Sequence, residues 1–120
     1  SHGLGDVYKR QLLNRKEKTM KKIINSIPYS TDSSCRLGYF QHRTILDPTY
    51  CREELYITRQ GTYFLYVEGR ESSPYCFQGD PFPTAGCDLT VLSDIEARIW
   101  AEHRLTPDEC EFIFPGPKAS

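Results

Sequence analysis

The 120-residue chain lacks several features that would assign it to a broad class of protein. No stretch approaches the roughly 18 consecutive apolar residues of a membrane-spanning helix, and the segment that begins at Met20 lacks the apolar core and cleavage site of a signal peptide. The five cysteines are odd in number and form no CxxC pair, which argues against a disulfide framework. We therefore expect a cytoplasmic protein without a membrane anchor.

Catalytic patterns are missing as well. No glycine-rich phosphate loop is present, and residues 20–120 hold only two histidines, neither of them in a local enzyme signature. Glu53 and Glu54 are adjacent in a predicted strand, so their side chains point to opposite faces and cannot share acid–base work. We therefore predict a non-enzymatic protein without a cofactor. A zinc- or thiol-dependent binding module stays open as an alternative, with the candidate ligands His42, Cys51, Cys76 and Cys87.

The first 19 residues carry two nucleotide-level signatures. Residues 1–11 resemble a translated sequencing adapter, because residues 6–11, back-translated with permitted codons, give a transposase mosaic end, as in an assembled metagenome read. The codons permitted for residues 15–19 can contain a bacterial ribosome-binding site at a suitable distance before Met20. Met20 is the only methionine of the chain. We therefore expect residues 1–19 to be an adapter and untranslated-leader artefact and residues 20–120 to be a single small domain.

Residues 20–120 are acidic, and the acidic excess lies in their second half. They hold 10 basic and 14 acidic residues, a net charge of −4, and residues 68–120 alone hold four basic and ten acidic residues. This low basicity disfavours direct nucleic-acid binding, although several arginines alternate with aromatic residues between positions 36 and 59. An acidic surface can instead bind a basic nucleic-acid-binding protein, or it can be a solvated pair of helices.

The clearest structural pattern is a β-hairpin. Residues 53–58 and 62–68 are rich in β-branched and aromatic side chains, and the turn between them contains Gly61, which readily adopts a positive φ. Large apolar groups on both faces of the second arm predict a central strand. Shorter patterns predict strands at 21–25, 39–42 and 89–92, a turn at 26–28, a helix at about 30–37 and loops at 43–50 and 69–88.

Two capping boxes predict a pair of C-terminal helices. Ser93 and Glu96 begin a helix that runs to about Arg104, and Thr106 and Glu109 begin a shorter one that ends near residue 114. The expected fold class is therefore α+β, a small antiparallel β-meander of three to four strands packed by this helix pair. The predicted core consists of Leu55, Ile57, Leu65, Ala97, Trp100, Ala101, Leu105 and Phe112.

The first of these helices carries two opposed apolar stripes. One stripe contains Ala97 and Ala101, and Ile95 and Ile99 lie nearly opposite. The second stripe has to meet the second helix, the long loop 69–88 or another molecule, including a second copy of the chain. The loop is predicted to be either a lid over the sheet or a recognition surface. The candidate partner-binding residues are Ile95, Ile99, Glu102, Asp108, Glu109, Glu111, Tyr75, Phe77 and Phe82.

Two segments carry a resemblance to a family. Residues 54–69 read ELYITRQGTYFLYVEG, and residues 92–114 read LSDIEARIWAEHRLTPDECEFIF. This pair of segments resembles a family of small uncharacterised proteins from gut Firmicutes and their phages and mobile elements. Small proteins encoded in that genomic context include anti-CRISPR inhibitors. The resemblance implies an inhibitor that blocks a basic surface of a host nucleoprotein such as a CRISPR effector. An accessory domain without an inhibitory role stays open.

Overall fold

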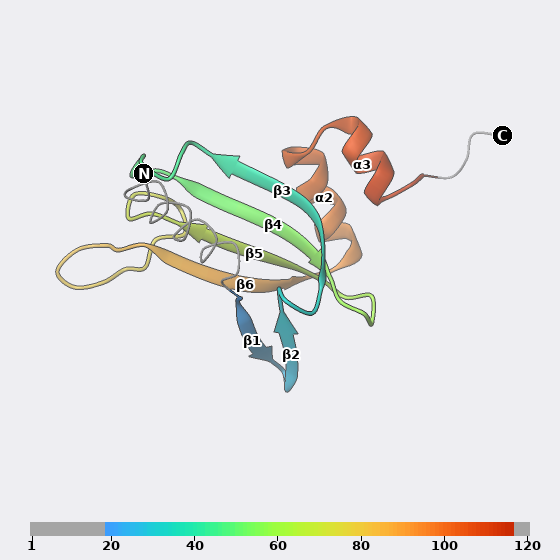
Figure 1. Ribbon diagram of the computed structural model, residues 1–120, viewed down its shortest axis with the longest axis horizontal. Helices are drawn as coiled ribbons and strands as arrows, with labels where there is room; N and C mark the ends of the chain where they lie inside the picture. Colours follow the sequence, from blue (N-terminus) through green and yellow to red (C-terminus); the bar gives the residue numbers. More distant parts are fainter. Residues whose placement is uncertain (1–18, 117–120) are drawn as a thin grey trace, which may run out of the picture.

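The computed structural model of the chain describes residues 19–116 (Figure 1). The predicted leader lies outside these residues except for Thr19. A four-stranded antiparallel sheet, a separate two-stranded hairpin and two C-terminal helices together make an α+β fold, as predicted. The elements are β1 (Lys21–Ile24), β2 (Ile27–Ser30), β3 (Cys35–His42), β4 (Cys51–Ile57), β5 (Tyr63–Gly69), β6 (Gly86–Leu92), α2 (Asp94–Arg104) and α3 (Pro107–Ile113).

The large sheet is a meander with the order β3-β4-β5-β6. The predicted hairpin forms its centre, and β5 lies between β4 and β6 as expected for a strand with two apolar faces. Gly61 lies in the β4–β5 turn with a φ of 88°. The four strands are therefore joined by sequential connections, which is the simplest way to build an antiparallel sheet.

Each face of the sheet packs against a different element. Glu53 on β4 accepts a hydrogen bond from Trp100 on α2, so the face that contains Glu53 and Leu55 is the helix face. On the opposite face, Tyr56 of β4 stacks on Phe64 of β5 with ring centroids 5.1 Å apart. A cluster of buried residues there joins the sheet to the β1–β2 hairpin, and its members are Tyr29, Tyr56, Phe64 and Leu89.

Three of the eight predicted core residues are buried in the structure. Leu55, Ala97 and Ala101 are fully buried, as predicted. The prediction for Phe112 is wrong, because its side chain is 88% exposed and α3 buries none of its residues. Ile57, Leu65, Trp100 and Leu105 are partly buried. The sequence interpretation missed the cluster under the hairpin, because no local pattern showed that β1 and β2 would fold back onto the sheet.

Two local predictions, for residues 30–37 and 26–28, differ from the structure. The predicted helix at 30–37 is wrong, because β3 begins at Cys35 and pairs there with β4. The polar residues before it turn locally instead, with the backbone N–H of Asp32 donating to Ser30 Oγ at 3.2 Å. The predicted turn at 26–28 is displaced to Asn25 and Ser26, which have φ values of 51° and 68° and form a tight hairpin turn.

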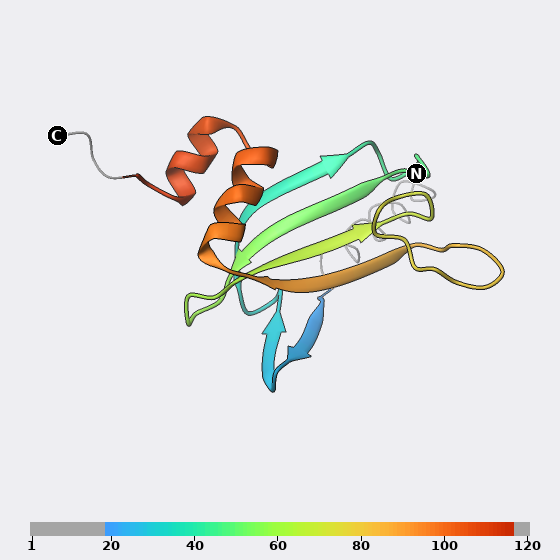
Figure 2. The ribbon, with the colours of Figure 1, turned by 180° about the vertical axis from the view of Figure 1, so that it is seen from behind.

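Both capping boxes are confirmed. Ser93 Oγ accepts from the backbone N–H of Glu96, and the Glu96 carboxylate accepts from the backbone N–H of Ser93. Thr106 and Glu109 make the same reciprocal pair at the start of α3. α2 crosses the helix face of the sheet, and α3 lies further out beside α2 (Figures 1 and 2). No helix among residues 19–116 has the length and apolar character needed to cross a membrane.

Candidate functional site

The outward side of α2 carries two exposed isoleucines. The side chains of Ile95 and Ile99 are 70% and 48% exposed, whereas Ala97 and Ala101 on the opposite side are completely buried. The two opposed stripes predicted for this helix are therefore both present, and only one of them contributes to the core. The other presents branched apolar side chains to solvent one helical turn apart, an arrangement that suits an interface.

The charge around these isoleucines is negative. Residues 94–113 hold six acidic and two basic side chains. Both basic groups have partners, because Arg104 donates to Glu53 and the Arg98 guanidinium lies 5.1 Å from the centre of the Phe114 ring. The acidic residues predicted to bind a partner are all exposed, namely Glu102, Asp108, Glu109 and Glu111.

Glu109 differs from the other three acidic residues because it also has a structural role. Its carboxylate accepts the backbone N–H of Thr106 at 3.0 Å. This hydrogen bond lowers the pKa of Glu109 below its usual value, so the group stays ionised at neutral pH. Glu109 therefore contributes to the negative field of the surface while its geometry is fixed by the helix cap.

The three aromatic residues predicted to bind a partner all lie in the long loop before β6, but their environments differ. The Tyr75 hydroxyl donates to Glu53 on the helix face, so Tyr75 is a structural anchor. Phe77 and Phe82 are each 65% exposed, and the backbone of Phe77 pairs with Thr84 to close the loop. The loop projects beyond the end of the sheet in both views (Figures 1 and 2). Its outer part, which contains Phe77 and Phe82, is therefore exposed, whereas Tyr75 anchors its first part to the helix face of the sheet.

The proposed metal or thiol ligands are not assembled into a site. His42 and Cys51 are register partners on β3 and β4, but Cys87 lies on β6 opposite Glu68. Among the described residues 19–116, no three His, Cys, Asp or Glu side chains are grouped so that they could hold a metal ion. Burial, and secondarily the charge of Glu53, raises the pKa of the Cys51 thiol, which disfavours the reactive thiolate.

Glu53 is a buried carboxylate whose role was not predicted. It is only 2% exposed, and it accepts from Trp100 Nε1 at 2.7 Å and from Arg104 Nε at 3.1 Å, as well as from the Tyr75 hydroxyl. One carboxylate thereby joins β4, α2 and the long loop. Because its oxygens are occupied by these donors, the arrangement is suited to hold the fold together, and no acid–base role follows from it.

The most extensive group of charged side chains lies on the other face of the sheet. There the strands β3, β4 and β5 form the floor of a hollow of about 1100 Å³, which we call the sheet-face hollow. Its charged lining residues are Asp32, Arg36, Arg52, Glu54, Glu68 and Arg70, and its tyrosines are Tyr39, Tyr50, Tyr56 and Tyr66. The sequence interpretation noted some of these arginines and aromatics but did not place them in one site.

The carboxylates of the sheet-face hollow are fixed by short contacts. Arg36 Nη1 lies 2.6 Å from Glu54 Oε2, and the Tyr56 hydroxyl donates to Glu54 Oε1 at 3.2 Å. The Tyr66 hydroxyl donates to Glu68 Oε1 at 3.0 Å. Burial, together with the adjacent Glu54, raises the pKa of Tyr56 to about 12, so this hydroxyl remains a donor at neutral pH. The carboxylates of the hollow are therefore joined to their neighbours in a network of ion pairs and hydrogen bonds.

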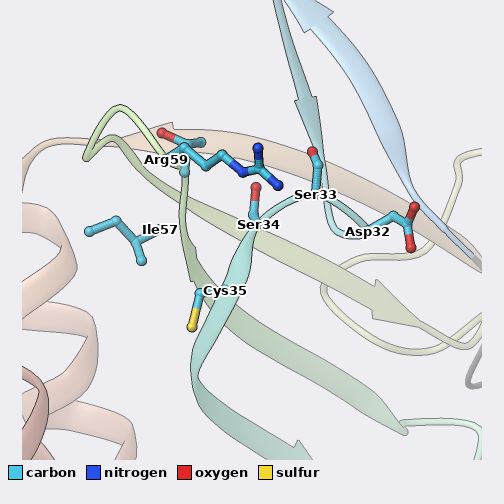
Figure 3. Close-up of a pocket in the computed structure, with 7 residues that line it drawn as sticks. Asp32, Ser33, Ser34, Cys35, Ile57 and Arg59 are labelled. Atoms are coloured by element: carbon cyan, nitrogen blue, oxygen red, sulfur yellow. The ribbon is translucent and has the colours of Figure 1, made fainter.

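A second, smaller depression lies beside the β4–β5 turn (Figure 3). It has a volume of about 310 Å³, and the guanidinium of Arg59 lies next to Ser34 in it. Arg59 is exposed, and the depression is lined by no buried charged side chain. It therefore lacks the preorganised polar groups that distinguish a binding site.

Comparisons with known proteins assign the chain to no family. No family model, no curated protein and no solved structure matches the chain. The helix pair and the sheet-face hollow each present a surface of defined chemistry.

Proposed function

We propose that this chain is a non-enzymatic protein-binding inhibitor, of the anti-CRISPR type, that acts in the cytoplasm and blocks a basic surface of a host nucleoprotein. The observation that carries the proposal is the exposure of Ile95 and Ile99 on a helix whose opposite stripe is fully buried. A helix already docked on its own sheet has no structural need for a second apolar stripe. The stripe is explained by contact with a partner.

The charge of the helix pair supports the choice of a basic partner. Glu102, Asp108 and Glu111 are exposed, and the two arginines of residues 94–113 are engaged within the chain. Nucleic-acid-binding proteins present lysine and arginine surfaces, to which an acidic competitor is electrostatically complementary. The acidic side chains speed association, and the isoleucines provide the buried apolar contact that slows dissociation.

Binding to purified Cas effector–guide complexes tests the proposal. The full chain is added to a panel of these complexes, and binding and target-DNA cleavage are both measured at low and at physiological ionic strength. We expect one complex to bind the chain and to lose cleavage activity, with weaker binding at higher salt because the attraction is screened. Absence of both binding and protection across the panel would contradict the proposal.

The chain offers a matched pair of variants for this assay. Ile95 on α2 and Ile23 on β1 are both 70% exposed, so replacing either one with aspartate removes similar exposed apolar area and adds the same charge. We expect Ile95→Asp to weaken binding by about tenfold or more and Ile23→Asp to leave it unchanged. Equal loss with both variants would show that Ile95 has no specific role.

A further inference from the structure

The sheet-face hollow lies on the opposite side of the sheet from α2. Neighbouring residues of a strand point to opposite faces, so Arg52, Glu54 and Tyr56 face away from the helix that Glu53 contacts. The volume of about 1100 Å³ is at the upper end of the range of pockets that hold small molecules. Any ligand bound there is separate from the partner proposed for the helix pair.

Arg52 at the centre of the hollow has unused hydrogen-bonding capacity. Its side chain is 28% exposed, and its Nη2 lies 3.6 Å from Glu54 Oε1 and 3.6 Å from Glu68 Oε1, beyond hydrogen-bond distance. Its Nε is buried without a hydrogen-bond partner. The carboxylates of Glu54 and Glu68 accept hydrogen bonds from tyrosine hydroxyls instead. On the exposed side of this guanidinium, Nη2 makes no hydrogen bond with either carboxylate, so it can donate to an acceptor oxygen of a ligand.

The charge balance of the hollow restricts the ligand class. Three arginines and three acidic residues line it, and Arg36 and Arg52 lie within ion-pairing distance of Glu54 or Glu68. A polyanion would meet Glu54 and Glu68, and a polycation would meet Arg36 and Arg52, so each would be repelled by part of the lining. A neutral ligand that both donates and accepts hydrogen bonds suits this lining better.

The tyrosines add an apolar surface to this polar floor. Tyr39 is 41% exposed, and the cationic groups of Arg36 and Arg52 lie 5.5 and 5.8 Å from the centre of its ring. Sugar rings combine hydroxyl groups, which both donate and accept, with C–H faces that pack on aromatic rings. We propose that the sheet-face hollow binds a neutral saccharide, with Arg52 as the donor to a sugar oxygen, the more exposed Glu68 as an acceptor, and Tyr39 as the packing surface.

Saturation-transfer NMR on the full chain tests the proposal with defined probes. The probes are maltotriose, cellotriose and N,N′-diacetylchitobiose, with glycine betaine as the zwitterionic control and inorganic phosphate as the anionic control. We expect at least one saccharide to bind with a millimolar Kd and both controls to fail. No saccharide binding, or binding of phosphate or glycine betaine without any saccharide, overturns the proposal.

Two variants assign the binding to the hollow. Tyr39→Ala removes a partly exposed ring outside the buried cluster, so the fold is expected to survive, as circular dichroism verifies. We expect it to weaken saccharide binding by about tenfold. Ile95→Asp, on the other side of the sheet, leaves saccharide binding unchanged. Unchanged binding in Tyr39→Ala, or equal loss in Ile95→Asp, overturns the assignment.

Discussion

Glu53 links three parts of the chain that are far apart in sequence. Replacing it with alanine leaves the donors of Trp100, Arg104 and Tyr75 without their shared acceptor. We expect Glu53→Ala to lower the free energy of unfolding by about 3 kcal/mol, because unsatisfied buried donors are costly. Glu53→Gln keeps one acceptor oxygen and should lose roughly half as much. Urea titration followed by Trp100 fluorescence measures both.

The control for this prediction is Glu71→Gln. Glu71 pairs with its neighbour Arg70 on the surface, so the urea midpoint should stay unchanged. If Glu53→Ala unfolds at the same urea concentration as the original chain, Glu53 is not the stabilising hub that its contacts indicate.

The sequence contained part of the signal for Glu53. Strand alternation puts it on the same face as Leu55 and Ile57, although its burial was not predicted. Its partners could not be predicted, because Tyr75, Trp100 and Arg104 lie 22, 47 and 51 positions further along the chain. Local residue rules such as Gly61 in the turn succeeded, because neighbouring residues alone determine them.

At the scale of elements, the two capping boxes give a matched comparison. α2 buries Ala97 and Ala101 against the sheet, whereas α3 buries no residue. We expect Ser93→Ala to lower the free energy of unfolding by about 1 kcal/mol, because α2 is part of the core and the loss of its cap destabilises the folded state as a whole. Thr106→Ala should reduce helical circular dichroism without moving the urea midpoint of Trp100 fluorescence. Equal shifts in the two variants would mean that α3 unfolds cooperatively with the sheet.

The elements that were predicted correctly have short-range signals. The β4–β5 hairpin and both helix starts are defined by residues within a few positions of one another. The helix expected at 30–37 failed because its polar start also suits a turn, and pairing with β4 decided in favour of a strand. The sheet-face hollow could not be predicted either, because it needs the register of three strands and the position of two loops.

At the scale of the whole molecule, tyrosine–carboxylate pairs occur on both faces of the sheet. The hydroxyls of Tyr56 and Tyr66 donate to Glu54 and Glu68 in the sheet-face hollow, and Tyr75 donates to Glu53 on the helix face. Burial is the largest cause that raises the pKa of each of these tyrosines, and their carboxylate partners raise it further. Both faces of the sheet therefore carry a hydrogen bond that needs a protonated tyrosine.

This dependence predicts a loss of stability at alkaline pH. Unfolded tyrosines lose their protons near pH 10, whereas folded Tyr56 keeps its proton up to a pKa of about 12. The folded state therefore binds more protons than the unfolded state in this window, so its stability is fully present below about pH 10 and falls as the pH rises towards about 12. The raised pKa of Cys51 acts in the same direction at lower pH.

Tyr56→Phe isolates the contribution of one tyrosine. This variant loses a hydrogen bond to Glu54 and should be less stable at neutral pH, yet its free energy of unfolding should fall less between about pH 9 and about pH 11.5, by about 1–2 kcal/mol. Urea titrations across this range measure the slope, and Tyr39→Phe, whose hydroxyl donates to Gln41 and not to a carboxylate, serves as the control. The same slope in Tyr56→Phe as in the original chain would show that Tyr56 titrates alike in the folded and unfolded states. Its hydroxyl would then not be the buried donor that fixes Glu54 beside Arg36.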